Sequence, residues 1–253
     1  MKIESGGCSD VGRIRTNNED SYRILTPLNL FVLSDGMGGE AHGEVASAIA
    51  VETVVTHCAE AESNPSVTLF CDPRPGWSER TRRLASAVHL ANRKIYRSAE
   101  ENEEQQGMGA TLTVAWIQGD RLSVAHVGDS RAYLVSGGGI RQLTRDHSLV
   151  AQLVESRQIT PEQARTDPRR NVVTRSVGVG GSVEIDAERV EPGLQDGDTV
   201  LLCTDGLHGL VTDEELARAA SGADLRRACD DLIALAKQRG GHDNITVILA
   251  RVG

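Results

Sequence analysis

The stretch VLSDGMGGEAHGEVA, residues 32–46, decides how this chain is interpreted. It begins inside an apolar, strand-like run, reaches a single carboxylate at Asp35, and continues into a helical pattern. Glycines surround the acid, at positions Gly36, Gly38, Gly39 and Gly43. Because glycine has no side chain, it lets another backbone or a ligand approach closely. The stretch therefore predicts a strand followed by a helix, with a polar group held at their junction.

Three more places repeat the pattern of an apolar strand next to a single Asp with a small or turn-forming neighbour. They are VAHVGDS (124–130), VLLCTDG (200–206) and GGHDNITV (240–247). Taken singly, each is more often a plain turn, since Asp-Gly and Asp-Asn are common turn dipeptides. In adjacent antiparallel strands, however, the end of one strand and the start of its neighbour lie on the same edge of the sheet. We therefore expect these acids to meet at one rim: Asp35, Asp129, Asp205 and Asp243.

Carboxylates gathered at one rim would repel one another in a site of low dielectric, unless some took up protons or a cation joined them. Oxygen ligands without His or Cys at ligand spacing favour Mg²⁺ or Mn²⁺ over Zn²⁺. The Gly36 carbonyl is a further candidate ligand, and Glu19 and Asp20 join the same rim if a strand follows them. Arg15 beside such a cluster suggests an anion site, because a guanidinium binds phosphate oxygens in a bidentate way. The alternative for this early group is a solvated turn with a surface Arg.

The bulk composition is that of a globular protein, and we expect one domain over residues 1–253. The chain has 253 residues, a net charge of −9 and five scattered cysteines. The negative charge argues against a nucleic-acid partner, which needs a basic surface. The N-terminus lacks a signal-peptide core, and no apolar run approaches the roughly 18 residues of a membrane helix. Cysteines without C-x-x-C spacing indicate reduced thiols, so we expect a cytoplasmic protein.

Strand and helix patterns occur in blocks along the chain. Strand patterns cover 28–34, 110–118, 121–128, 131–136, 198–204 and 244–252. Helical patterns cover 43–62, 78–105, 213–220 and 224–240. This order lacks the strict alternation of a doubly wound sheet and predicts an α+β layered domain, with antiparallel sheets packed together and covered by helices. The segment 147–181 has short helical pieces without clear strands, and such long excursions are usually functional or mobile.

A series of motifs also occurs in a fixed order. They are RTNNED (15–20), DGMGG (35–39), GMGATLT (107–113), VGDSR (127–131), TRDHSLV (144–150), TDG (204–206) and GGHDNIT (240–246). Together they resemble the motifs of the metal-dependent PPM-type protein phosphatases, the protein phosphatase 2C-like family, in its bacterial serine/threonine branch. The resemblance runs from Cys8 to Val252. It implies a four-layer α/β/β/α sandwich, in which two antiparallel sheets are flanked by helix pairs and two metals lie at one end.

The resemblance implies a role for the acids of the rim. Asp35 would bridge the two divalent cations, Mn²⁺ or Mg²⁺, and the Gly36 carbonyl would bind one of them. Asp205 and Asp243 would complete the shell of the other cation. Asp129, with Asp205, would bind a third, weaker ion.

The resemblance also implies the chemistry. Glu19 and Asp20 would lie at or just outside the metal shell, and Arg15 would grip the substrate phosphate. A hydroxide that bridges the two metals would attack phosphoserine or phosphothreonine, while the metals and Arg15 neutralise charge on the phosphoryl oxygens. Residues 147–181 would form a flap beside the site.

The motifs do not determine which acid protonates the leaving group. Eukaryotic relatives often carry His after the Asp-Gly pair, where this chain has Met37, which cannot donate a proton. A metal-bound water is the first hypothesis. His42 is close in sequence, although a surface or capping position is more usual for such a His, and His147 is interpreted as structural.

The sequence thus predicts a monomeric, metal-dependent protein serine/threonine phosphatase. Its partners would be phosphorylated proteins and a bacterial serine/threonine kinase that opposes it. One alternative is a stress-response phosphatase of anti-sigma-factor antagonists, although those relatives tend to lack the element at 15–20. Another is a non-catalytic regulator with the same fold, which the retention of Asp35, Asp205, Asp243 and Arg15 argues against.

Overall fold

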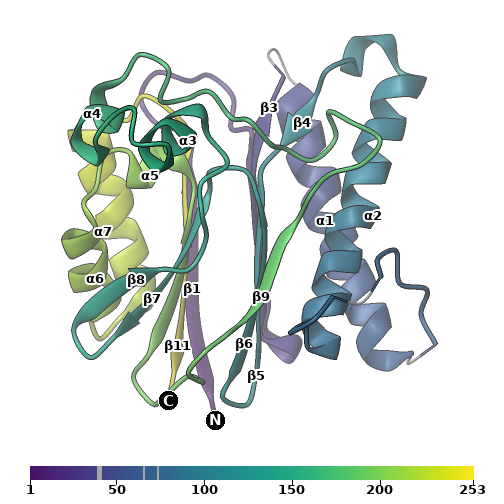
Figure 1. Cartoon of the computed structure of the whole chain (residues 1–253). Coiled ribbons are helices and arrows are strands. Elements are labelled where there is room, and N and C mark those ends of the chain that lie inside the picture. The colour runs from purple at the N-terminus through teal and green to yellow at the C-terminus, as the bar shows by residue number, and fades with distance from the viewer. Residues whose placement is uncertain (39–41, 65, 73) are drawn as a thin grey trace.

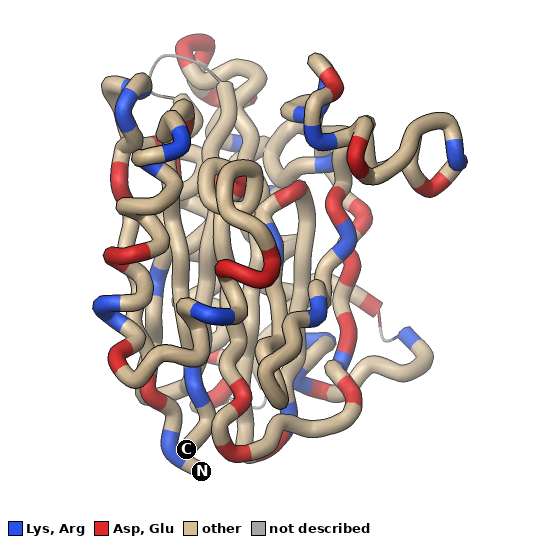
Figure 2. The backbone as a smooth tube through the Cα atoms, turned by 90° about the vertical axis from the view of Figure 1, so that its left-hand side faces the viewer, with Lys and Arg blue, Asp and Glu red and all other residues tan. Residues whose placement is uncertain are grey.

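The computed structural model describes residues 1–38, 42–64, 66–72 and 74–253, so Gly39 lies outside the described residues. Two antiparallel sheets stand face to face, and each carries helices on its outer side (Figure 1). The predicted α+β layered sandwich is therefore confirmed. Acidic and basic residues are interleaved along the described chain (Figure 2). Within these residues, no helix combines the length and apolar character that crossing a membrane requires.

The first sheet has the strand order β1-β11-β10-β7-β8. Its strands are β1 (Ile3–Asp10), β7 (Arg131–Ser136), β8 (Gly139–Gln142), β10 (Thr199–Cys203) and β11 (Ile245–Val252). The second sheet has the order β2-β3-β5-β6-β9, and β4 pairs with β3. Its strands are β2 (Asp20–Leu25), β3 (Leu30–Met37), β4 (Gly109–Ala110), β5 (Leu112–Gln118), β6 (Arg121–Val127) and β9 (Asp186–Val190).

A helix pair covers the outer face of each sheet (Figure 1). The second sheet is covered by α1 (His42–Ser63) and α2 (Glu79–Glu101), and the first by α6 (Asp213–Ala220) and α7 (Leu225–Gln238). The shorter helices are α3 (Leu149–Glu155), α4 (Pro161–Thr166), α5 (Asp205–His208), η1 (Thr26–Leu28) and η2 (Glu103–Gln105).

The alternation of side chains along β3 explains why its apolar run is continuous. Leu30 and Val32 pack against α1 and α2, whereas Phe31 and Leu33 face the other sheet. Successive residues of a strand point to opposite faces. Because both faces are covered, every position must be apolar, and the strand shows no polar alternation.

Capping residues place the starts of α2 and α6 where the sequence predicts them. The Ser78 side chain accepts a hydrogen bond from the Thr81 amide at the start of α2. Thr212 and Glu215 form the predicted capping box of α6. The α2 helix ends at Glu101, short of the predicted 105, and a 3₁₀ turn follows it.

Several strand assignments need correction, among them β8, which was not predicted, and the predicted strand 110–118, which is divided into β4 and β5. The strand β3 continues to Met37, so Asp35 lies inside it and not just past its end, because β4 pairs with Gly36 and Met37. The strand β1 was not predicted, and its Gly-rich stretch IESGGCSD lies at a sheet edge. The strand β9, a largely exposed edge strand, was not predicted either.

The segment 147–181 contains α3, α4 and irregular chain, as predicted. Two isolated bridges involve this segment: Ser148 pairs with Val173 inside it, and Val177 pairs with Ala110 in the body of the protein. The second bridge joins the segment to β4, next to the end of β3 that carries Asp35.

Candidate active site

The predicted acids of the rim come together at one end of the sandwich. Asp35 of β3 is paired in register with Asp20, the first residue of β2. Asp129 follows β6, Asp205 opens α5 directly after β10, and Asp243 precedes β11. The other four carboxylates all act on the titration of Asp35. The convergence thus follows from strand ends that are adjacent in space and distant in sequence.

The glycines around Asp35 allow helix α1 to begin directly against the strand. A Cβ atom on Gly36 would lie 2.0 Å from the carbonyl oxygen of Gly43, which belongs to the first turn of α1. A Cβ atom on Gly43 would lie 2.8 Å from the Glu19 carboxylate. The Gly36 amide in turn donates to the Glu19 carbonyl at 3.1 Å. Side chains at either glycine would force α1, β3 and Glu19 apart.

Burial and mutual repulsion raise the pKa values of the acids of the rim, because the nearby cations do not balance their negative charges. Burial, reinforced by Asp20, raises the pKa of Asp35 well above its usual range. Burial raises the pKa of Asp20 to about 7, although hydroxyl hydrogen bonds oppose the rise. Burial and Asp205 raise the pKa of Asp129 to about 8. Burial and Asp243 raise the pKa of Asp205 to about 6, even though Asp35 hydrogen bonds to it.

Arg15 supplies part of the missing positive charge. Its Nε lies 3.0 Å from Asp243 Oδ1, and its Nη2 donates to Asp243 Oδ2 at 3.1 Å. The charges of Glu19 and Asp35 also act on this guanidinium. Half of the Arg15 side chain is exposed, so the group is accessible from solvent while it faces the acids.

The side chains do not form a complete metal shell by themselves. Among the described residues, no three His, Cys, Asp or Glu side chains are close enough together to hold an ion. Both oxygens of Asp243 are engaged by Arg15. A cation at this end would therefore need backbone carbonyl and water ligands, or a turn of Asp243 away from Arg15.

The donor set nevertheless fits a hard divalent cation. Asp20 Oδ2 accepts hydrogen bonds from Thr204 and Thr246 at 3.0 and 2.6 Å. Asp20 Oδ1 is buried and has no hydrogen-bond partner among the described residues. An unpartnered buried carboxylate oxygen is costly. Oxygen ligands of this kind are those that Mg²⁺ and Mn²⁺ bind, so the residues present suit such an ion.

Asn244 is a positioning residue that the sequence analysis missed. Its Nδ2 donates to the carbonyls of Val11 and Asn17 at 3.0 and 2.9 Å. Its Oδ1 accepts from the Glu19 amide at 2.8 Å. One buried amide thus holds the loop that carries Arg15 and Glu19. The motif GGHDNIT contains Asn244, but nothing in that motif indicates that its partners lie more than 200 positions earlier.

Arg131 and Asp146 were also missed, although both lie in quoted motifs. Arg131 donates from Nε and Nη2 to both Asp146 oxygens at 2.7 to 3.1 Å. This buried pair fixes the start of β7, two residues after Asp129. On the other side, His208 Nε2 lies 3.0 Å from the Asp129 carbonyl oxygen. The residues that support Asp129 thus include an ion pair, Arg131 with Asp146, whose charges compensate each other.

The two histidines considered as proton donors differ in their surroundings. His147 is buried, and its Nδ1 accepts from the Gly128 amide at 3.0 Å. Its Nε2 lies 3.2 Å from Asp186. These contacts suit the structural interpretation of His147. His42 is the first residue of α1 and lies close to Gly38, where a Cβ would be 3.5 Å from the His42 Cβ.

Comparison with known proteins places the chain in a family. The model of a family described as Protein phosphatase 2C matches residues 13–249. The chain belongs to this protein phosphatase 2C family.

Curated relatives support the assignment to protein phosphatase 2C. The chain is 38% identical over 244 residues to the serine/threonine protein phosphatase PstP of Mycobacterium tuberculosis, covering 96% of this chain. That alignment covers 44% of PstP, so the chain spans less than half the length of this relative. It is 36% identical over 245 residues to the serine/threonine phosphatase stp of Listeria innocua, covering 95% of this chain and 92% of that protein.

Solved structures of the family share this fold. The crystal structure of the Mycobacterium tuberculosis serine/threonine phosphatase PstP/Ppp matches with a TM-score of 0.87 at 35% identity, covering 100% of this chain and 99% of that chain. The catalytic domain of PstP in complex with two manganese ions matches with a TM-score of 0.81 at 33% identity, covering 99% of both chains. The resemblance and the fold predicted from the sequence are therefore confirmed.

Proposed function

We propose that the chain is a metal-dependent phosphatase that hydrolyses phosphoserine and phosphothreonine in proteins. The observation that carries the proposal is the buried, mutually repelling acidic rim around Asp35, with Arg15 facing it. The named relatives are serine/threonine phosphatases, which favours this function over the stress-response alternative. A regulator without catalysis would have no use for so costly a group of buried carboxylates.

The residues that would hold two divalent cations follow from the rim. Asp35 would contact both, the Gly36 carbonyl one, and Asp205 and Asp243 the other. Asp129 would help Asp205 to hold a third, weaker ion. When bound, such ions activate water and neutralise charge on the transferred phosphoryl group. A relative solved with two manganese ions supports this number for the main site.

The chain's own groups would bind and orient the substrate. Arg15 would release Asp243 and bind the substrate phosphate in its place. A guanidinium can donate two parallel N–H groups to either partner. Glu19 and Asp20 would hold water at or just outside the metal shell. Asp20 is fixed for this by Thr204 and Thr246, which donate to one of its oxygens, while no described residue donates to the other.

The proposal extends to partners and surroundings. Phosphorylated proteins would be the substrates, and a bacterial serine/threonine kinase would oppose the phosphatase. We also propose a monomer, with one phosphatase domain over residues 1–253. All five cysteines have free thiols, as a reducing compartment such as the cytoplasm would leave them.

Release of phosphate from purified protein tests the function. Phosphothreonine and phosphoserine peptides should be hydrolysed in Mn²⁺ or Mg²⁺, and a chelator should abolish turnover. A phosphotyrosine peptide of the same sequence serves as the matched control for the substrate class. A phosphorylated anti-sigma-factor antagonist, assayed beside the peptides, addresses the alternative. Metal-independent hydrolysis, or none with any metal, would overturn the proposal.

A further inference from the structure

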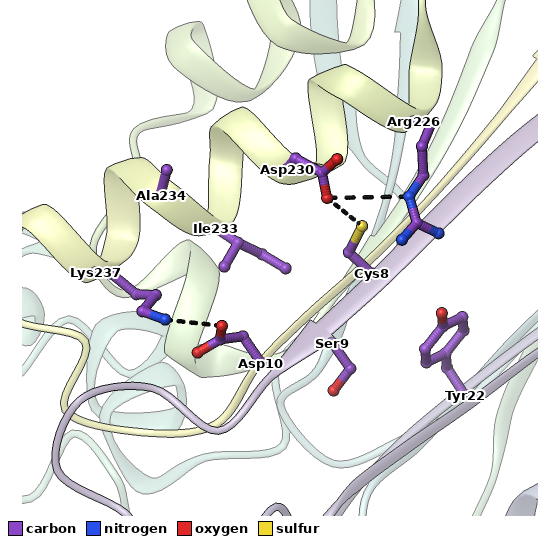
Figure 3. A pocket seen from close by; sticks show the side chains of 9 residues that line it. All are labelled: Cys8, Ser9, Asp10, Tyr22, Arg226, Asp230, Ile233, Ala234 and Lys237. Atoms are coloured by element: carbon purple, nitrogen blue, oxygen red, sulfur yellow. Dashed lines mark hydrogen bonds and ion pairs between the residues drawn. The ribbon is translucent and has the colours of Figure 1, made fainter.

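A cavity of about 630 Å³ lies outside the acidic rim, between α7 and the edge strands β1 and β2 (Figure 3). Three residues that line it, Ser9, Asp10 and Lys237, also hold the loop that carries Arg15. Figure 3 shows Lys237 reaching from α7 to Asp10 at the end of β1. The cavity wall and the phosphate-binding loop therefore share residues.

Residues of the cavity floor fix both ends of loop 11–18. Asp10 Oδ1 accepts from the Gly12 amide at 2.8 Å, which closes a turn at the start of the loop. Ser9 Oγ accepts from Asn18 Nδ2 at 2.8 Å near its end. Arg15 lies between these two attachments. A change in the position of Asp10 is thus transmitted to the base of the loop.

Lys237 determines where Asp10 lies. Its Nζ donates to Asp10 Oδ2 at 2.8 Å, so the two oxygens of Asp10 have separate tasks. One oxygen binds α7, and the other binds the loop. The end of α7 is also joined to the loop through the Arg13 amide, which donates to the Gly241 carbonyl at 2.8 Å.

The turn that Asp10 closes touches Asp243 directly. Gly12 has a φ of +83°, and a Cβ atom there would lie 2.2 Å from the Asp243 carbonyl oxygen. A side chain would be both strained and obstructed at this position. The geometry of the turn therefore sets the distance between the loop and Asp243, whose carboxylate pairs with Arg15.

We propose that Lys237 is a positioning residue for phosphate binding, acting through Asp10 on the loop that carries Arg15. The inference rests on the proposed function, because it assigns Lys237 a share in the role of Arg15. Lys237 itself touches neither substrate nor metal in this scheme. It holds the guanidinium ready, so its loss raises KM and leaves the chemical step intact.

The chain offers a matched control in the same cavity. Arg226 is also a cation on α7 and lines the same cavity, but its partners are the Gly7 carbonyl at 2.9 Å and Asp230 at 3.9 Å. None of these contacts reaches loop 11–18. The variant Arg226→Met thus removes a charge and a long side chain from the cavity without touching the Arg15 loop.

The test compares Lys237→Met, Asp10→Ala and Arg226→Met with the unchanged protein. Hydrogen exchange, measured without added metal, should be about tenfold faster at residues 11–18 in the first two variants and unchanged at β5. In Mn²⁺, KM for a phosphothreonine peptide should rise about threefold in Lys237→Met and about tenfold in Asp10→Ala, with kcat within twofold. Arg226→Met should match the unchanged protein in every readout, and thermal melting verifies that all variants fold.

A double variant separates positioning from a general structural effect. In an Arg15→Ala background, Lys237→Met should raise KM no further, because the group that it positions is gone. An equal rise in both backgrounds would overturn the inference. So would Lys237→Met behaving like Arg226→Met while the unchanged protein hydrolyses the peptide. Absence of hydrolysis by the unchanged protein would instead reject the proposed function, and the exchange of residues 11–18 would still decide whether Lys237 holds the loop.

Discussion

Asp146 and Asp205 are two largely buried carboxylates near the same end of the sandwich, and their pKa values are shifted in opposite directions. Burial alone would raise the pKa of both. For Asp146, the hydrogen bonds and charge of Arg131 outweigh burial, so its pKa lies below the usual value. For Asp205, burial and the neighbouring Asp243 raise the pKa to about 6. The difference lies in the partner and not in the depth.

The contrast separates structural from functional acids in this molecule. Asp146 has a cation built into the chain, and the pair closes the junction between β7 and the segment 147–181. Asp35 and Asp205 have mainly other acids around them, so their stable form requires protons or external cations. A carboxylate without an internal partner is expensive to bury, and it is retained where an ion or substrate completes it.

The largest expected effect is on turnover, and it follows from a change at Asp35. Replacing Asp35 by Asn removes the charge that two cations would share and should lower Mn²⁺-dependent turnover about a thousandfold, as loss of a preorganised electrostatic group does. In chelator the variant should melt at the same or a higher temperature, because repulsion is relieved. Asp196→Asn, at an exposed position, is the control. Activity within tenfold of the unchanged protein would contradict the role of Asp35.

A change to the Arg131–Asp146 pair should lower the stability of the protein and should not alter its chemistry. Arg131→Met leaves Asp146 buried without its cation, and removal of one partner of a buried pair costs about 3–5 kcal/mol. Urea unfolding in chelator measures the loss, and Arg227→Met is the control because its pair with Asp231 is exposed. Equal stability of the two variants would mean that the buried pair contributes no more than a surface pair.

Arg15 lies between the two classes, since it is a cation that faces the functional acids. Arg15→Ala should raise KM for a phosphopeptide about tenfold, a magnitude typical of a lost charged hydrogen bond, and should not weaken Mn²⁺ binding. Calorimetric titration with Mn²⁺ and steady-state kinetics measure the two quantities. An unchanged KM, or a loss of Mn²⁺ affinity, would show that Arg15 serves the acids and not the phosphate.

The smallest effect is a pH dependence of stability in chelator. The raised pKa values of Asp20, Asp129 and Asp205 mean that the folded state holds more protons than the unfolded state between about pH 4 and pH 8. Stability should therefore fall as pH rises through this window.

Excess Mn²⁺ should reverse that slope, because binding displaces the protons and strengthens as pH rises. Thermal melts from pH 5 to pH 8, with and without the metal, measure both slopes. A flat profile in chelator would mean that the acids are compensated within the chain. In that case the distinction between Asp146 and Asp205 would disappear.

Much of the acidic rim was predictable, because it depends on patterns that the sequence carries locally. Apolar strands ending in single acids predicted that Asp129, Asp205 and Asp243 would meet Asp35. Capping residues likewise predicted where α2 and α6 begin. In both cases, short-range chemistry determines the outcome.

The contacts that tune the rim were not predictable in this way. Thr204 and Thr246 bind Asp20 across more than 180 positions of sequence, and nothing near either threonine indicates it. The strand β1 was missed because glycine and serine weaken its apolar signal, while its pairing with β11 fixes it as an edge strand. Asp35 lies inside β3 because a short partner, β4, extends the pairing beyond the apolar run.

The two ends of the chain are adjacent, since the Lys2 amide donates to the Gly253 carbonyl and the Gly253 amide to the Lys2 carbonyl. Figure 1 shows both termini at the bottom of the sandwich, whereas α5, which begins at Asp205, and the labelled end of β3, which contains Asp35, lie in its upper part. Anything attached to either terminus, such as a tether to a bead or a fluorescent label, would therefore leave from the opposite pole. The acidic rim would then remain accessible to a large phosphorylated protein, whichever terminus is anchored.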